Sequence, residues 1–214
     1  MPVNPTHLVD RFQLFVLIVL GESVARLIGA AALRPWSFPL AIVLAAALLT
    51  LAALWWGWLT AADRQALDGP RSIARFTAAN LPIVAGIAAA SAGLHIAILA
   101  AHGGGTIGGG TIGDGPRAAL YGGVSVYLLA SATLPSRSMT ARVRAWRITT
   151  ALAALGLVFM GAIVVPVFLV PALTAVLALG LAAEARQCSP RPIPGAAGEP
   201  RSVSANCREF TGLA

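Results

Sequence analysis

The first apolar segment of the chain, HLVDRFQLFVLIVLGESVARLIGAAA, carries five ionisable side chains: His7, Asp10, Arg11, Glu22 and Arg26. On a helix that turns about 100° per residue, all of them lie on one face. Glu22 and Arg26 are spaced i,i+4, which brings a carboxylate within reach of a guanidinium. This pattern predicts an ion pair inside an apolar helix, where it could bind or relay a proton, an ion or a small polar solute.

Two interpretations of this face remain open. Intramembrane ionisable groups are functional candidates by default, so Glu22 and Arg26 could line a polar pathway. Alternatively, the pair only fixes the register of a helix bundle. The three ionisable groups nearer the N-terminus lie at the expected membrane boundary, where charge costs little. A further candidate is His95, which lies on a later span at a depth close to that of Glu22.

The elements that must position these groups are apolar runs of roughly 20 residues, each long enough to cross about 30 Å of hydrocarbon as a helix. We therefore expect an all-α, polytopic membrane helix bundle within residues 1–184. Its six spans are predicted at about 8–31, 39–61, 77–100, 118–135, 147–165 and 168–184. The last two come from one continuous run, in which Pro166 and Pro171 of VVPVFLVP predict a tight turn.

Two segments have the composition of chain outside the bundle. The tail over residues 185–214 is rich in Pro, Gly, Ser and Arg and is expected to be disordered, because it cannot bury enough apolar surface to offset its ordering entropy. Residues 103–115 repeat GGGTI and are expected to form a flexible loop. No strand precedes this glycine-rich segment, so a phosphate-binding loop is not predicted.

The composition excludes most soluble chemistry. Of 214 residues, 57% are hydrophobic and 11% are charged, and the mean hydropathy is +0.80, which is too apolar for an ordinary soluble domain. There is no lysine, which excludes a GxxxxGK[ST] loop and a Schiff-base site. No HExxH motif and no Ser-His-Asp set can be assembled, so we expect no enzyme. Cys188 and Cys207 lie in the tail without a CxxC, and no metal or cofactor is expected.

Arginines are distributed unevenly over the predicted connections. With six crossings, one side of the membrane carries twelve of them and the other carries only Arg34 and Arg117, so the positive-inside rule places both termini in the cytoplasm. The net charge of +7 is thus explained by orientation, and nucleic-acid binding is not expected because the arginines form no continuous patch. The tryptophans fall toward predicted span ends and are expected to be interfacial anchors: Trp36, Trp55, Trp56, Trp58 and Trp146.

The first span also carries a resemblance to a known family. His7-Leu8, Arg11-Phe12, Leu14-Phe15 and Ile18-Val19-Leu20-Gly21-Glu22-Ser23 resemble the H-L-x-E-R-F-G-L-F-x-I-I-V-L-G-E-S motif of the bacterial low temperature requirement A family. Later similarities are Leu54-Trp55-Trp56, Leu81-Pro82-Ile83-Val84-Ala85-Gly86-Ile87, Ala92-Gly93-Leu94 and Ala119-Leu120-Tyr121-Gly122-Gly123. The resemblance implies a multi-pass inner-membrane protein tied to growth in the cold, similar to the C-terminal half of the family's longer members.

Two function classes follow from these observations. In the first, the protein moves a proton, ion or small polar solute along the face that contains Glu22. In the second, it is a non-transporting assembly or stress-adaptation component with a structural ion pair. The expected partners are the lipid bilayer and either a second copy of the chain or a companion half.

Overall fold

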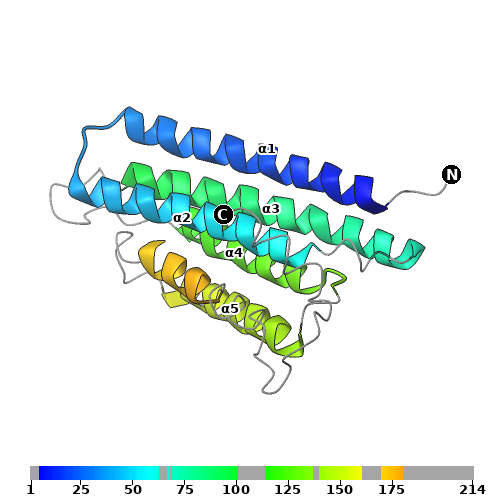
Figure 1. Ribbon diagram of the computed structural model, residues 1–214. Coiled ribbons are helices and arrows are strands. Elements are labelled where there is room, and N and C mark those ends of the chain that lie inside the picture. Colours follow the sequence, from blue (N-terminus) through cyan, green and yellow to red (C-terminus); the bar gives the residue numbers. More distant parts are fainter. Residues whose placement is uncertain are drawn as a thin grey trace, which may run out of the picture.

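The computed structural model describes residues 5–62, 67, 69–100, 114–136, 140–160 and 170–180, and these residues are all-α (Figure 1). The helices are α1 (Pro5–Ala32), α2 (Phe38–Ala61), α3 (Pro70–Ala100), α4 (Asp114–Ala132), α5 (Ala141–Met160) and a shorter apolar helix, Val170–Gly180. The predicted disordered tail, most of the glycine-rich segment and the turn at Pro166 lie outside the described residues. The expected number of helices, six, is found within the described residues.

Three of these helices are long and apolar enough to cross a membrane: His7–Ala32, Phe38–Ala61 and Pro70–Ala100. The sequence predicted six spans, so the prediction is supported for its first three. Helices α4 and α5 have 19 and 20 residues but carry charged side chains near their starts, which lowers their apolar character. The described part of the last helix is shorter still.

Several helices begin earlier than predicted because polar residues cap them before the apolar run starts. Helix α3 begins at Pro70 and not at 77. Ser72 Oγ accepts a hydrogen bond from Gly69 N and donates one to the carbonyl oxygen of Gly69. Helix α5 begins at Ala141 and not at 147, where Val143 N donates to Thr140 Oγ1. Such caps satisfy backbone groups that have no partner within the helix. These first turns therefore extend the helices past the apolar runs on which the boundaries were predicted.

Successive helices run in alternating directions and form a layered bundle (Figure 1). Helix α1 lies at one edge and packs on α2 and α3, while α4 and α5 lie on the opposite side. The inward stripe of α1 is apolar and includes the buried Val9, Val16, Leu20 and Leu27. An edge-to-face contact between Phe12 and Phe76, with ring centroids 5.6 Å apart, joins α1 to α3.

The closest helix contact is between α3 and α4, where glycines let the two backbones touch. A Cβ placed on Gly123 would lie 2.5 Å from the backbone nitrogen of Ala90, and one on Gly86 would lie 2.6 Å from the carbonyl oxygen of Gly123. A Cβ on Gly93 would lie 2.6 Å from the Cβ of Leu120. Small residues at such crossings are typical of membrane helix pairs, in which close packing replaces the hydrophobic effect.

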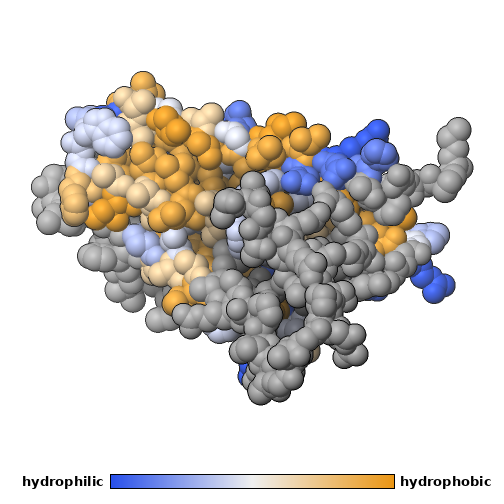
Figure 2. All heavy atoms as spheres, viewed as in Figure 1, coloured by the Kyte–Doolittle hydropathy of each residue, from blue (hydrophilic) through white to orange (hydrophobic). Residues whose placement is uncertain are grey.

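The outer surface of α1 and α2 is mostly hydrophobic, as Figure 2 shows. Exposed apolar side chains there include Leu14, Phe15, Ile18 and Leu49. Hydrophilic residues gather toward the ends of the helices in the same view. In a soluble protein a surface of this kind would be a liability, whereas in a bilayer it is the surface that meets lipid.

Candidate functional site

The Glu22–Arg26 ion pair predicted from the i,i+4 spacing is present on α1. Arg26 Nε donates to Glu22 Oε1 at 2.8 Å. Among the described residues, the partner of the Glu22 carboxylate is Arg26, so the negative charge is neutralised by a residue of the same helix. The predicted pair of charges is therefore formed without any residue from another helix.

This pair lies on the outward side of α1 and not inside the bundle. The Arg26 side chain is 67% exposed and that of Glu22 is 62% exposed. Glu22 is ten residues from the end of α1 at Ala32, which corresponds to roughly 15 Å along a helix, so it lies well within the apolar length. A charged side chain near the centre of a membrane helix costs on the order of 2.5 to 3.5 kcal/mol. Exposure at this depth therefore calls for a protein or water surface against the pair.

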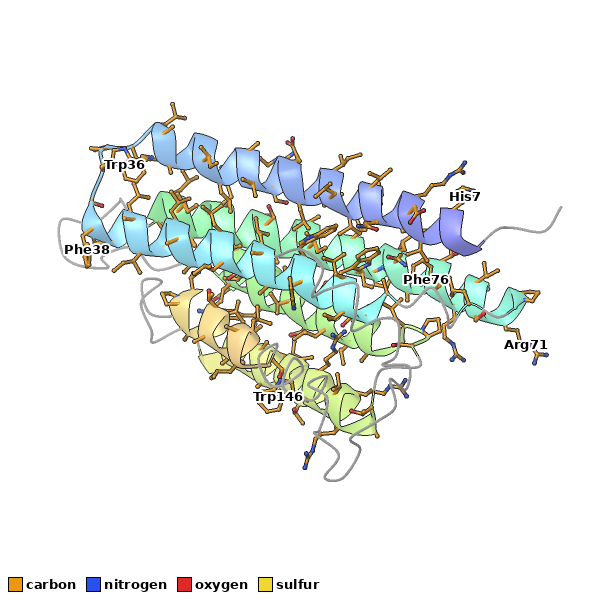
Figure 3. The ribbon with its side chains drawn as sticks, viewed as in Figure 1. His7, Trp36, Phe38, Arg71, Phe76 and Trp146 are labelled. Carbon is orange, nitrogen blue, oxygen red and sulfur yellow. The ribbon has the colours of Figure 1, made fainter. Side chains whose placement is uncertain are left out.

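The other predicted pathway residues make no hydrogen bond or ion pair with Glu22 within the described residues. His7 and Arg11 are exposed in the first turns of α1, and Asp10 beside them is half-buried. Figure 3 shows His7 at the end of the bundle near Arg71, away from Trp36 and Phe38 at the opposite end. His95 is half-buried on α3, and no hydrogen bond joins it to Glu22 within the described residues. Whether these residues form one pathway stays a prediction.

Polar side chains that the sequence analysis did not single out hold the interior together. Tyr127 Oη donates to the carbonyl oxygen of Leu54, which joins α4 to α2. Ser125 Oγ donates to the carbonyl oxygen of Ala151, which joins α4 to α5. These hydroxyl groups are buried, so each bond avoids the cost of an unsatisfied polar group.

A threonine pair makes a similar contact between α2 and the last helix. Thr50 Oγ1 and Thr174 Oγ1 are 2.8 Å apart, and each also lies within hydrogen-bond distance of the carbonyl oxygen of Ala46. Threonine in an apolar helix can bond its own preceding turn, so its presence in the sequence gives no signal of an interhelical contact. Side-chain hydrogen bonds therefore join α2 both to α4 and to helix Val170–Gly180.

Trp58 departs from the interfacial role expected of it. Its side chain is 1% exposed, and its Nε1 donates to Asn80 Oδ1 at 3.0 Å. Asn80 in turn donates to the carbonyl oxygen of Phe76 at 2.9 Å. The ring of Trp55 stacks on that of Trp58, with centroids 5.9 Å apart. The indole can be buried because α3 supplies an amide acceptor for its N–H group. In the sequence, the signal for this contact was a polar residue, Asn80, within an apolar run.

The remaining tryptophans lie nearer the surface. Trp36, Trp56 and Trp146 are 72%, 44% and 42% exposed. Trp36 lies in the connection between α1 and α2, at the end of the bundle (Figure 3). Their role as anchors at the headgroup level stays a prediction.

Arg147 is the most deeply buried charged residue among those described. It is 3% exposed on α5, and its Nη2 lies 3.3 Å from both the carbonyl oxygen of Gly57 and Thr60 Oγ1 of α2. Beside it is a small cavity of about 30 Å³. The cavity is lined mainly by apolar atoms of α2, α4, α5 and helix Val170–Gly180. No residue of α1 lines it, so it does not reach Glu22.

A second buried arginine lies at the start of α4. Arg117 Nη2 donates to Asp114 Oδ1 at 2.6 Å, and the arginine is buried while the aspartate is exposed. Arg117 Nε and the hydroxyl group of Tyr121, one turn later, have no hydrogen-bond partner within the described residues. In the described ranges no three His, Cys, Asp or Glu side chains are grouped so that they could hold a metal ion.

Apolar helices of spanning length, buried polar side chains bonded across helices and an apolar outer surface define an α-helical membrane protein with several candidate spans. The family model described as bacterial low temperature requirement A protein (LtrA) matches residues 1–183. The chain belongs to this family. No curated protein and no solved structure matches it.

Proposed function

We propose that this protein is a membrane component of bacterial adaptation to low temperature that does not carry a solute through its own bundle. The observation that supports this proposal most is the position of the Glu22–Arg26 pair. The carboxylate is already neutralised by its own helix, on the outer face of α1. The cavity beside Arg147 has walls from other helices. A polar route through one copy of the chain would need to connect the Glu22 carboxylate with the cavity beside Arg147.

The interior hydrogen bonds support the same proposal. Several buried polar side chains of α2 bond neighbouring helices, as Trp58 does with Asn80 and Thr50 does with Thr174. Groups that are satisfied by protein have little capacity left to replace the water shell of a moving ion. In this proposal their role is to fix the packing of the bundle.

Movement of a proton or a small cation is the second candidate. It is favoured by the exposure of the Glu22 side chain, because an accessible carboxylate at this depth can exchange a proton if water reaches it. That water would have to lie between α1 and a covering protein surface.

Flux measurements on the purified protein in liposomes distinguish the two candidates. A pH-sensitive dye inside the vesicles reports protons, and an ion-selective electrode reports Na⁺ or K⁺. We expect flux no greater than in empty liposomes. Flux that is present in the wild type and lost in Glu22→Gln, at equal protein incorporation, would overturn the proposal and support the second candidate.

We further propose that the chain crosses the inner membrane six times with both termini in the cytoplasm. The twelve arginines on one side and the alternating helix directions in Figure 1 support this topology. Reporter fusions after Gly109 and after Ala214 should lie on opposite sides of the membrane. Two reporters on the same side would contradict it.

A further inference from the structure

The outward face of α1 combines three features that no contact within the described residues explains. Glu22 and Arg26 are exposed at a depth where lipid would surround them. Gly21 and Gly29 have no atom within 4 Å of a Cβ built on them. Large apolar side chains, including Ile18, are exposed beside them.

The spacing of these residues places them along one helix face. Gly21, Ala25 and Gly29 recur every four residues, so they form a stripe that crosses the outside of α1 at a shallow angle. Glu22 and Arg26 each follow a small residue of this stripe and therefore line its side. Small residues at this spacing allow helices to approach closely enough for backbone contact.

On α3 and α4, the glycines Gly86, Gly93 and Gly123 are used for such contacts. A Cβ on Gly86 or Gly123 would clash with the backbone of the facing helix, which therefore already occupies the space beside these glycines. Gly21 and Gly29 on α1 are glycines too, but no described atom lies within 4 Å of a Cβ built on either of them. No helix in the described part of the chain occupies that space.

We infer that the stripe Gly21, Ala25, Gly29, with Glu22 and Arg26 along its side, is the contact surface between two copies of this chain, paired through α1. Two copies inserted with the same orientation pack α1 against α1 in parallel around a two-fold axis. This pairing is independent of whether the protein carries a solute.

Charge complementarity identifies a second copy as the occupant. The proposed contact surface on each α1 presents one carboxylate and one guanidinium a turn apart, with a net charge of zero. The hydrogen bond from Arg26 Nε uses one carboxylate oxygen, so both terminal nitrogens of the guanidinium and the second oxygen can still bond. A two-fold axis sets the same donors and acceptors against them, which completes a neutral group of four charged side chains away from lipid.

Disulfide trapping in native membranes tests the contact. In a background with Cys188→Ser and Cys207→Ser, the variant Ala25→Cys should give a covalent homodimer under mild oxidation. The matched control is Ala45→Cys, because Ala45 is an exposed alanine seven residues from the start of α2, as Ala25 is seven residues from the end of α1. Equal dimer yields at the two positions would overturn the inference.

Association measured in liposomes at decreasing protein-to-lipid ratio tests the residues. Gly21→Leu should weaken pairing by about tenfold or more, on the scale of helix contacts in membranes. The bundle itself should remain intact, since no atom of the described residues lies within 4 Å of a Cβ built at this position. Gly156→Leu on α5, which also meets nothing within 4 Å, is the matched control and should pair normally.

The charges are tested by exchanging them. Glu22→Leu should weaken pairing, whereas the exchange Glu22→Arg with Arg26→Glu keeps both the i,i+4 pair and the two-fold complement and should restore it. A chain that stays monomeric at every lipid ratio would refute the inference. Trapping of Ala25→Cys on a different membrane protein, with no homodimer, would refute the choice of occupant.

Discussion

The contact between α3 and α4 and the outer face of α1 use the same residue types with opposite surroundings. Gly86 and Gly123 face backbone atoms closer than a Cβ would allow, while Gly21 faces open space. Arg147 is buried and bonded to a neighbouring helix, while Arg26 is bonded to its own helix and exposed. A small or charged residue in an apolar helix therefore indicates a contact, but it does not show whether that contact lies within one chain or between two.

The largest expected effect concerns the glycine contacts. Gly123→Leu should destabilise the bundle by about 3 kcal/mol, because the new side chain meets backbone atoms of α3 that cannot move aside. Gly21→Leu should not lower the stability of a detergent-solubilised monomer. Thermal unfolding of both purified variants measures this difference. Equal losses of stability would contradict the different surroundings of Gly123 and Gly21.

The next effect concerns the ion pair on α1. Glu22→Gln leaves the Arg26 guanidinium without its partner in an apolar environment and should cost about 2 to 3 kcal/mol, seen as lower abundance in membranes. Replacing both residues, Glu22→Leu with Arg26→Met, should restore abundance, since no charge remains to be solvated.

Growth at low temperature gives the double variant a second readout. If the protein is a non-transporting component, the abundant double variant should support growth of a deletion strain in the cold, although pairing of copies is weakened. An abundant double variant that fails to support growth, and whose failure is not reproduced by Gly21→Leu, would instead assign the Glu22 carboxylate to transport.

A smaller effect is expected at the buried amide between α2 and α3. Asn80→Ala removes the acceptor of Trp58 Nε1 and should destabilise the bundle by about 1 kcal/mol. The matched variant Trp58→Phe removes the donor and leaves Asn80 bonded to the carbonyl oxygen of Phe76. A double variant no worse than the worse single variant would confirm that the two side chains act as a pair, whereas additive losses would contradict it.

The sequence predicted the number of helices found in the described residues, but the starts of α3 and α5 and the partners of the polar groups only in part. Apolar runs and i,i+4 spacing are local, so the helix positions and the Glu22–Arg26 bond could be derived from the chain alone. Which face of α1 turns outward is decided by the packing of Val16, Leu20 and Leu27 on α2 and α3. The burial of Trp58 depends on an acceptor 22 residues away, which local spacing does not reveal.

The smallest expected effect changes sign with the state of the protein. Gly21→Ala should stabilise a solubilised monomer by up to about 1 kcal/mol, because alanine restricts the unfolded chain more than glycine does and the added methyl group meets no atom. In the paired state the same methyl group would hold two α1 helices apart, so it should weaken association in liposomes. Gly156→Ala on α5 should stabilise the monomer without changing association. A stabilised monomer whose pairing is unchanged would place the contact between copies on another surface and leave the α1 glycines unexplained.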